Sequence, residues 1–346
     1  GAVYVHDAFS NSIIDSEFIN NSAKNGGAIY FNGETNNVTI SGNFKGNDAE
    51  RAGGAIFVRG QSRNNNFSAE FYDNRAGQAS GGAIFFYNLA ENNVFESIFT
   101  TNYALYGGGM FFYKKANSNK FSSDFTNNTA ESCGGAIFFY NTTDKNNFTG
   151  TFINNSALGE VSETVGNGGA ITFKNISTNS IFTCDFINNT AALNGGGVNY
   201  RETPQNITFN GNFINNTSPR GGGVNFFESF ENVIFNGEFI ANSAVNGGAI
   251  AAGEGIIKDV SFKNNHAVTG GAVFFRINGS VTNCNFTGNN ALGTGGAIFA
   301  VNNINILNSV FDNNSAGKYG GAVYINNTFS NSKISSVFIN NSANNG

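Results

Sequence analysis

The chain has 346 residues, among them 45 Gly, 37 Phe, 2 Pro and no Trp, and 12% of its residues are charged. Its net charge of −5, without a basic block, argues against a nucleic-acid partner, and no apolar run approaches the roughly 20 residues of a transmembrane helix. So much Phe excludes a disordered chain, and an alphabet of Gly, Asn and Phe favours many short strands joined by tight turns.

The first element of each repeat is a glycine motif, two glycines (or one at the start of the chain) followed by Ala or Gly and then Ile, Val or Met. Alternation along a strand puts the second and fourth residues after the second glycine on one face, so we expect Ile29 and Phe31 and their equivalents to point inward. The glycines themselves allow positive φ and a close approach between coils. The second glycine of the motif lies at Gly1, Gly27, Gly54, Gly82, Gly108, Gly135, Gly169, Gly196, Gly222, Gly248, Gly271, Gly296 and Gly321.

A looser apolar run follows, as in Asn37-Val38-Thr39-Ile40, and then a Phe-x-x-Asn motif. We expect the Phe of this motif to form an inward stack and its Asn to form a hydrogen-bonded ladder at a corner. The motif begins at Phe18, Phe44, Phe71, Phe99, Phe125, Phe152, Phe186, Phe213, Phe239, Phe262, Phe286, Phe311 and Phe338.

Two motifs that repeat together about every 26 residues define the architecture. A leucine-rich repeat is excluded because the Leu ladder is missing, and a collagen helix because glycine is not every third residue. The sequence therefore predicts an all-β fold, a right-handed single-stranded parallel β-helix of about thirteen coils with three short strands per coil. We expect residues 1–346 to form one continuous domain.

The paired Gly-Gly-Ala-Ile and Phe-x-x-Asn motifs resemble the repeats of the chlamydial polymorphic outer-membrane proteins, and they are also similar to Asn-rich adhesin-like surface proteins of methanogenic archaea. The archaeal proteins are closer in character, because the bacterial family would add a C-terminal membrane barrel. Either resemblance implies a secreted β-helix at the cell surface that acts in adhesion, and neither supplies catalytic residues.

An aromatic column three residues after the second glycine is the feature that stands out from the repeat. We expect it to face solvent, because the same column accepts Thr172, Asn199 and Asn225. An exposed aromatic stripe edged by small residues would be a contact surface for another protein or for a glycan, while plain β propensity is the alternative explanation. The stripe comprises Tyr4, Tyr30, Phe57, Phe85, Phe111, Phe138, Phe274, Phe299 and Tyr324.

The outward column just before each Phe contains the best carboxylates for catalysis, Glu17, Glu70, Asp124, Asp185 and Glu238. They recur in alternate coils, roughly 10 Å apart, which relieves repulsion but is too wide for a catalytic pair at about 5–9.5 Å. We therefore expect no enzyme, and no cofactor or metal. A pectinase-like carbohydrate-active or carbohydrate-binding β-helix is the alternative. Mixed charges from Asp48 to Arg75 favour a solubilising surface over a binding patch.

Two local features point to surface roles. Residues 158–167 form an insertion, since Gly169 follows Gly135 at a longer interval than usual, and insertions in solenoids often lie at surface corners and bind ligands. The chain also begins and ends inside the repeat, so we expect the array either to continue or to associate with itself, end to end or laterally.

Seven Asn-x-Ser/Thr sequons lie two residues after the Phe and are candidates for N-glycosylation, although corners also favour Asn for backbone reasons. They are Asn20, Asn127, Asn154, Asn188, Asn215, Asn313 and Asn340. The three cysteines, Cys133, Cys184 and Cys284, are expected to be buried free thiols.

Together these features predict an extracellular, non-catalytic adhesin or structural stalk that displays a long rigid β-helical surface. Its expected partners are itself, a host or neighbouring cell surface, or a glycan.

Overall fold

A computed structural model describes residues 1–159, 166–327, 330 and 332–346, and every regular element in those ranges is a β-strand. The chain divides into two compact units, Gly1–Cys184 and Asp185–Gly346. Each unit is a parallel β-solenoid, and the chain makes about thirteen turns spaced by about 26 residues, which confirms the predicted fold class. That residues 1–346 form one continuous domain stays a prediction.

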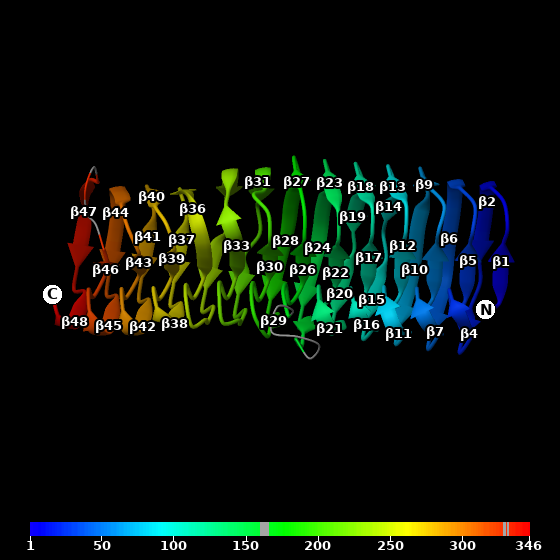
Figure 1. Ribbon diagram of the computed structural model, residues 1–346, viewed down its shortest axis with the longest axis horizontal. Coiled ribbons are helices and arrows are strands. Elements are labelled where there is room, and N and C mark those ends of the chain that lie inside the picture. Colours follow the sequence, from blue (N-terminus) through cyan, green and yellow to red (C-terminus); the bar gives the residue numbers. More distant parts are fainter. Residues whose placement is uncertain (160–165, 328–329, 331) are drawn as a thin grey trace. The chain divides into compact units, whose positions relative to one another are not determined.

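The strands form three ladders, A, B and C, coloured from blue to green for the first unit in Figure 1, and in two turns of the second unit ladder C is reduced to isolated bridges at Thr217, Arg220, Ser243 and Asn246. The A strands begin after the glycine motif, the B strands hold the middle run and the Phe, and the C strands follow the corner Asn. In the first unit the A strands are β1 (Val3–Val5), β5 (Ile29–Phe31), β8 (Ile56–Val58), β12 (Ile84–Phe86), β17 (Met110–Phe112), β22 (Ile137–Phe139) and β26 (Ile171–Phe173). The B strands are β2 (Phe9–Asp15), β3 (Phe18–Ile19), β6 (Thr35–Lys45), β9 (Ser62–Arg63), β10 (Asn66–Tyr72), β13 (Leu89–Glu91), β14 (Val94–Phe95), β15 (Ile98–Thr100), β18 (Lys115–Asn117), β19 (Lys120–Ser122), β20 (Asp124–Thr126), β23 (Thr142–Asp144), β24 (Asn147–Ile153), β27 (Ser177–Thr178) and β28 (Ile181–Ile187). The C strands are β4 (Ser22–Asn25), β7 (Asp48–Ala52), β11 (Arg75–Ser80), β16 (Tyr103–Tyr106), β21 (Thr129–Cys133) and β25 (Ser156–Ala157).

The second unit repeats this plan. Its A strands are β30 (Val198–Tyr200), β33 (Val224–Ser229), β36 (Ile250–Lys258, which continues into ladder B), β39 (Val273–Phe275), β43 (Ile298–Ala300) and β46 (Val323–Ile325). Its B strands are β31 (Gln205–Phe209), β32 (Phe213–Ile214), β34 (Glu231–Phe235), β35 (Glu238–Ile240), β37 (Ser261–Lys263), β40 (Gly279–Thr282), β41 (Asn285–Thr287), β44 (Ile304–Asp312) and β47 (Ile334–Ile339). Its C strands are β29 (Thr190–Ala191), β38 (His266–Thr269), β42 (Asn290–Thr294), β45 (Ser315–Tyr319) and β48 (Ser342–Asn345).

Strands pair in register, motif on motif. Ile29 is opposite Ile56 in ladder A, and Phe44 is opposite Phe71 in ladder B. Like residues therefore stack along each unit: the rings of Phe44 and Phe71 are stacked at 4.9 Å, and both side chains are buried. Ile29 and Phe31 are fully buried as well. The predicted inward columns are confirmed.

The corner Asn of each Phe-x-x-Asn motif forms the predicted ladder. Asn102 illustrates it: its amide donates to the Phe71 carbonyl and to Asn128 Oδ1, and its own Oδ1 accepts from the backbone N–H and the side chain of Asn74. In the second unit Asn242, Asn265 and Asn289 are linked in the same way. Because buried amides cost free energy when unpaired, this column fixes the register of neighbouring coils.

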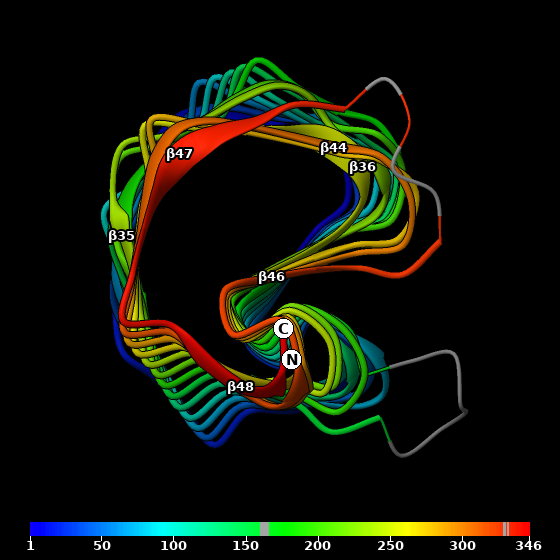
Figure 2. The ribbon, with the colours of Figure 1, turned by 90° about the vertical axis from the view of Figure 1, so that its left-hand side faces the viewer.

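The glycine motif makes the chain fold back on itself. Figure 2 shows that strand β46 of the last coil runs between the B strands and β48. The first glycine of a pair supplies the left-handed turn, as at Gly53 with φ 65°. The second glycine lies against the C strand of the next coil, so that a Cβ on Gly54 would be 2.6 Å from both N and O of Arg75. Strand A is therefore covered on both sides, unlike a strand in a simple triangular coil.

Candidate functional site

The aromatic column does not form the expected exposed stripe. Phe57, Phe85, Phe111 and Phe138 are only 7%, 7%, 4% and 3% exposed, and Phe299 is also buried. The expectation that this column faces solvent is wrong for these residues, because the fold-back places the C side of the coil over the outer face of strand A. Tyr4, at 57% exposed, does face solvent, while Tyr30, Phe274 and Tyr324 are half-buried.

These rings form a second apolar core outside the first. Phe57, Phe85, Phe111 and Phe138 pack with Ala52 and Cys133, which come from C strands. The rings stack on one another, with Phe85 lying 5.0 Å from both Phe57 and Phe111. Because both faces of Phe85 and of Phe111 are occupied by neighbouring rings, this part of the column cannot offer a face to a sugar, and it serves packing. Whether its exposed ends contact a partner stays a prediction.

A tyrosine ladder that the sequence reasoning missed lies just after the A strands, two residues beyond the aromatic column; Tyr87 is exposed, while Tyr113 and Tyr140 are half-buried. The rings of Tyr87 and Tyr113 are stacked at 5.1 Å, as are those of Tyr113 and Tyr140. Lys114 Nζ lies 5.1 Å from the Tyr87 ring centre, and Lys174 Nζ lies 3.9 Å from that of Tyr140. The sequence signal for this ladder was a tyrosine five residues after the second glycine in three successive coils. The ladder presents phenol hydroxyls and ammonium groups at the edge of the second core.

In the second unit, small residues interrupt the aromatic column. Asn225 and Ala251 are neighbours in register, and Ala251 is opposite Phe274. The space that the missing rings would fill is a depression of about 330 Å³ bordered also by Arg220 and Arg276. The Arg276 side chain is already engaged, because it lies 3.9 Å from Glu228 and donates to the Phe227 carbonyl.

Three of the five outward carboxylates engage groups of the following coil. Asp124 Oδ1 accepts hydrogen bonds from the backbone N–H and hydroxyl of Thr151, at 2.9 and 2.7 Å. Lys263 Nζ lies 2.6 Å from Glu238 Oε1, and the N–H of Asn212 donates to Asp185. Glu17 and Glu70 are exposed. The prediction that this column faces outward is confirmed for Glu17, Glu70 and Asp124, whereas Asp185 and Glu238 are half-buried.

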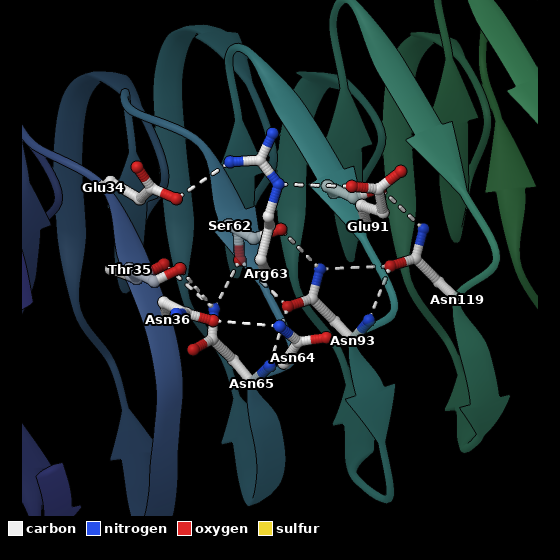
Figure 3. A network of polar contacts seen from close by, with 11 residues as sticks. Glu34, Thr35, Asn36, Ser62, Arg63, Asn64, Asn65, Glu91, Asn93 and Asn119 are labelled. Carbon is white, nitrogen blue, oxygen red and sulfur yellow. Dashed lines mark hydrogen bonds and ion pairs between the residues drawn. The ribbon is translucent and has the colours of Figure 1, made fainter. Parts of the chain in front are cut away.

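A polar network at the corner between ladders A and B ties three coils of the first unit together (Figure 3). Arg63 bridges Glu34 at 2.8 Å and Glu91 at 3.2 Å. The hydrogen bonds that Arg63 donates to the carboxylates of Glu91 and Glu34 raise the pKa of its guanidinium above the ordinary value. Beneath them Asn65, Asn93 and Asn119 form a second buried asparagine ladder. The charges of this region therefore hold neighbouring coils together.

The sequon asparagines share an exposed position and an unusual backbone. All seven side chains are exposed, and all have positive φ, for example 54° at Asn20 and 56° at Asn127. The same column has positive φ where no sequon exists, as at Asp73, Thr101 and Ala241. Because Asn tolerates this conformation better than most residues, the backbone alone explains its frequency there. Glycosylation of these sites stays a prediction.

The remaining reactive groups are structural. Cys133, Cys184 and Cys284 are buried free thiols, as predicted, and burial raises the pKa of Cys284 to about 11.

Within the described ranges no group of three or more His, Cys, Asp or Glu could hold a metal ion. No helix in those ranges is long and apolar enough to cross a membrane. Most of the predicted 158–167 insertion, residues 160–165, lies outside the described residues.

Comparison with known proteins agrees with the class that this geometry defines, a β-solenoid built from paired glycine and Phe-x-x-Asn motifs. Residues 15–32, 122–140 and 308–326 match the Chlamydia polymorphic membrane protein repeat. Each matched segment runs from the end of a B strand through the corner Asn and the C strand to the A strand. The chain therefore carries repeats of this type, as the motifs predicted, whereas the resemblance to archaeal adhesins stays a prediction. No curated protein and no solved structure matches the chain.

Proposed function

We propose that the chain is an extracellular, non-catalytic protein of the cell surface, an adhesin or structural stalk that works by displaying the outward side of its coils. The observation that carries this proposal is the match of three segments to the repeat of a membrane-protein family. Those segments contain the fold-back, the part of the coil that distinguishes this solenoid from a plain triangular one.

The use of polar groups within the coils supports a structural role. The side chains of both asparagine ladders and of Arg63 form their hydrogen bonds with neighbouring coils. The carboxylates of Asp124, Asp185 and Glu238 are occupied in the same way. A catalytic acid or base must instead keep its oxygens directed at a substrate.

Surface location can be tested on intact cells of the source. An antiserum raised against residues 1–346 should label unpermeabilised cells, and mild external protease should remove the signal while a cytoplasmic marker survives. Beads coated with the purified chain should bind host or neighbouring cells more than beads coated with a heat-unfolded sample. Labelling only after permeabilisation would contradict the proposal.

The rival proposal, a pectinase-like enzyme, predicts turnover of acidic or neutral polysaccharides. A reducing-end assay should detect no product with the wild-type chain. Turnover that is lost in Glu70→Gln or Asp124→Asn would favour the enzyme, because both carboxylates belong to the outward column.

A further inference from the structure

Three successive coils of the second unit are shorter than the rest between their two motifs. Phe239 follows Gly222 by 17 residues (239 − 222), the spacing of the full-length coils. Phe262 follows Gly248 by only 14 (262 − 248), and the next two coils have 15. The missing residues must come from the segment that joins ladder A to ladder B.

The shortening moves a corner. In the full-length coil the left-handed residue of this segment is Asn232, with φ 49°, seven residues before Phe239. In the short coils it lies three residues before the Phe, at Asp259, Asn283 and Asn308, with φ of 59°, 55° and 50°. Strand β36 therefore continues without a break from Ile250 to Lys258. In the preceding coil the corresponding segment is divided by a corner into two strands, β33 and β34.

The moved corner opens the ladder between two neighbouring coils. Strands β33 and β36 pair as far as Ser229 and Glu254, with a register shift, and pairing resumes at Glu238 and Ser261. Between these points β34 pairs with β31 but, among the residues described, not with β36. The opening is a cleft of about 450 Å³, whose lining includes Val233, Ile234 and Ile256.

A second depression, of about 490 Å³, continues this cleft across the short coils and shares Phe230, Glu231 and Ile256 with it. Its lining is polar and contains neither Lys nor Arg. Glu254, Asn278, Ser280, Asn303 and Asn305 line it, together with Thr203, Ser229, Gly255 and Gly279.

The side chains of this wall form a grid. Gly255 is in register with Gly279, and Gly279 with Ile304, so the preceding residues Glu254, Asn278 and Asn303 succeed one another coil by coil. Neighbouring coils in a parallel stack are about 4.8 Å apart. Within the described chain, the side chains of Glu254, Asn278 and Ser280 make no hydrogen bond and so are available to a ligand. Asn303 Oδ1 already accepts from the Ser330 N–H, and Asn305 Oδ1 from the Lys333 N–H.

The apolar side of the cleft is equally available. Ile234 is 48% exposed and Ile256 is 63% exposed, which is unusual for isoleucines that line a concavity. Phe230 is buried against Gly255 and offers no ring face. A ligand that carries hydroxyl groups and apolar C–H faces matches this pairing of an apolar wall with a few placed polar groups.

We propose that this cleft binds a neutral oligosaccharide chain that lies across the short coils. Carboxylate and amide groups at successive rungs accept and donate hydrogen bonds to sugar hydroxyls, while the C–H faces pack against Ile234 and Ile256. Glu231 and Glu254 disfavour an anionic sugar by like-charge repulsion, and the one cation of the two linings, Lys258, lies 3.6 Å from the carboxylate of Asp259. The assignment deepens the proposed surface role by naming a ligand class, and it rests on that role only for its biological setting.

The test is calorimetric titration of the chain 1–346 with cellohexaose, mannohexaose and chitohexaose, with hexagalacturonate and spermine as charged comparisons. At least one neutral hexasaccharide should bind. Ser280→Arg, which fills the grid, and Asn278→Ala should each weaken binding by about tenfold or more, roughly 1.4 kcal/mol. Ser261→Arg is the matched control, a half-buried outward serine of ladder B outside the cleft lining, and it should bind as the wild type does.

Three results would overturn the proposal: no neutral hexasaccharide binding at millimolar concentration, binding that Ser280→Arg leaves unchanged, or tighter binding of hexagalacturonate or spermine. Melting curves of each variant must match the wild type, and Asn278→Ala provides a second variant if Ser280→Arg unfolds. Cell adhesion by a chain that binds no sugar would remove this proposal and leave the surface role intact.

Discussion

Gly54 and Arg75 meet backbone to backbone, since a Cβ at Gly54 would lie 2.6 Å from the nitrogen and oxygen of Arg75. This contact joins the glycine motif of one coil to the residue that follows the Phe-x-x-Asn motif of the next. The same Cβ would lie 2.0 Å from the carbonyl oxygen of Gly82, so the glycine of the next coil and the residue after its corner Asn both close this position. A change in the spacing between the two motifs would disturb this packing.

Gly54→Ala should therefore destabilise the first unit by about 3 kcal/mol or more, because the clashing atoms belong to the backbone and cannot rotate away. Gly77→Ala is the matched control, since its Cβ would meet nothing closer than 3.4 Å. It should change the stability by no more than about 1 kcal/mol. Urea unfolding followed by circular dichroism measures both. Equal losses would show that the close approach is not what requires glycine.

Asn102→Ala should cost about 3–5 kcal/mol, because it leaves buried groups of Asn74 and the Phe71 carbonyl without partners. Asn341→Ala removes the same residue type from the last rung, which is half-buried and accepts from one neighbour, Asn314. Its cost should be clearly smaller in the same urea titration. A loss at Asn102 no greater than at Asn341 would mean that the ladder adds little.

Ala241→Gly should stabilise the second unit by about 1 kcal/mol, because Ala241 has φ 54°, a conformation that costs an L-residue about 1–2 kcal/mol. Ala244, at the same corner, is not among the residues with positive φ. Ala244→Gly should therefore have the opposite sign, a loss of up to about 1 kcal/mol. Thermal unfolding of the two variants gives the comparison, and a lower melting temperature for Ala241→Gly would contradict this account.

Phe85→Ala should cost about 3–5 kcal/mol, because Phe85 is 7% exposed and is stacked on both sides in the second apolar core. Tyr87→Ala, at the exposed end of the tyrosine ladder just after the same strand, should cost about 1 kcal/mol. Chemical unfolding distinguishes a packing column from a contact stripe. A stable Phe85→Ala chain that no longer adheres to cells would restore the original interpretation.

The parts of the fold that could be predicted are those set by a strict column. Ile29, Phe31 and Phe44 follow from alternation, and the asparagine ladder follows from a residue type that satisfies a corner. The burial of Phe85 could not be predicted in this way, because alternation gives two faces to strand A and does not reveal that the fold-back covers the second one. The sequence of a single repeat does not show that strand C will pack against the outer face of strand A.

The shortening that opens the cleft can be found in the sequence by comparing the intervals between the second glycine and the Phe of successive coils. The step from 17 to 14 residues between motifs, at Gly248 and Phe262, signals that a corner has lost residues. The effect of this loss on the strand ladder depends on which residue adopts the left-handed conformation. In this coil it is Asp259, but other Asn and Asp residues nearby could also have adopted it. The site therefore required the structure.

The in-register ladders also determine how the chain would respond to force. Within each unit a coil is held by hydrogen bonds to the coils on either side of it, so a pull on the chain loads the outermost coil before the others. Released coils of about 26 residues would each add roughly 85–90 Å of slack at full extension. A surface tether made in this way would lengthen one coil at a time under tension, dissipating load while most of its coils stay folded.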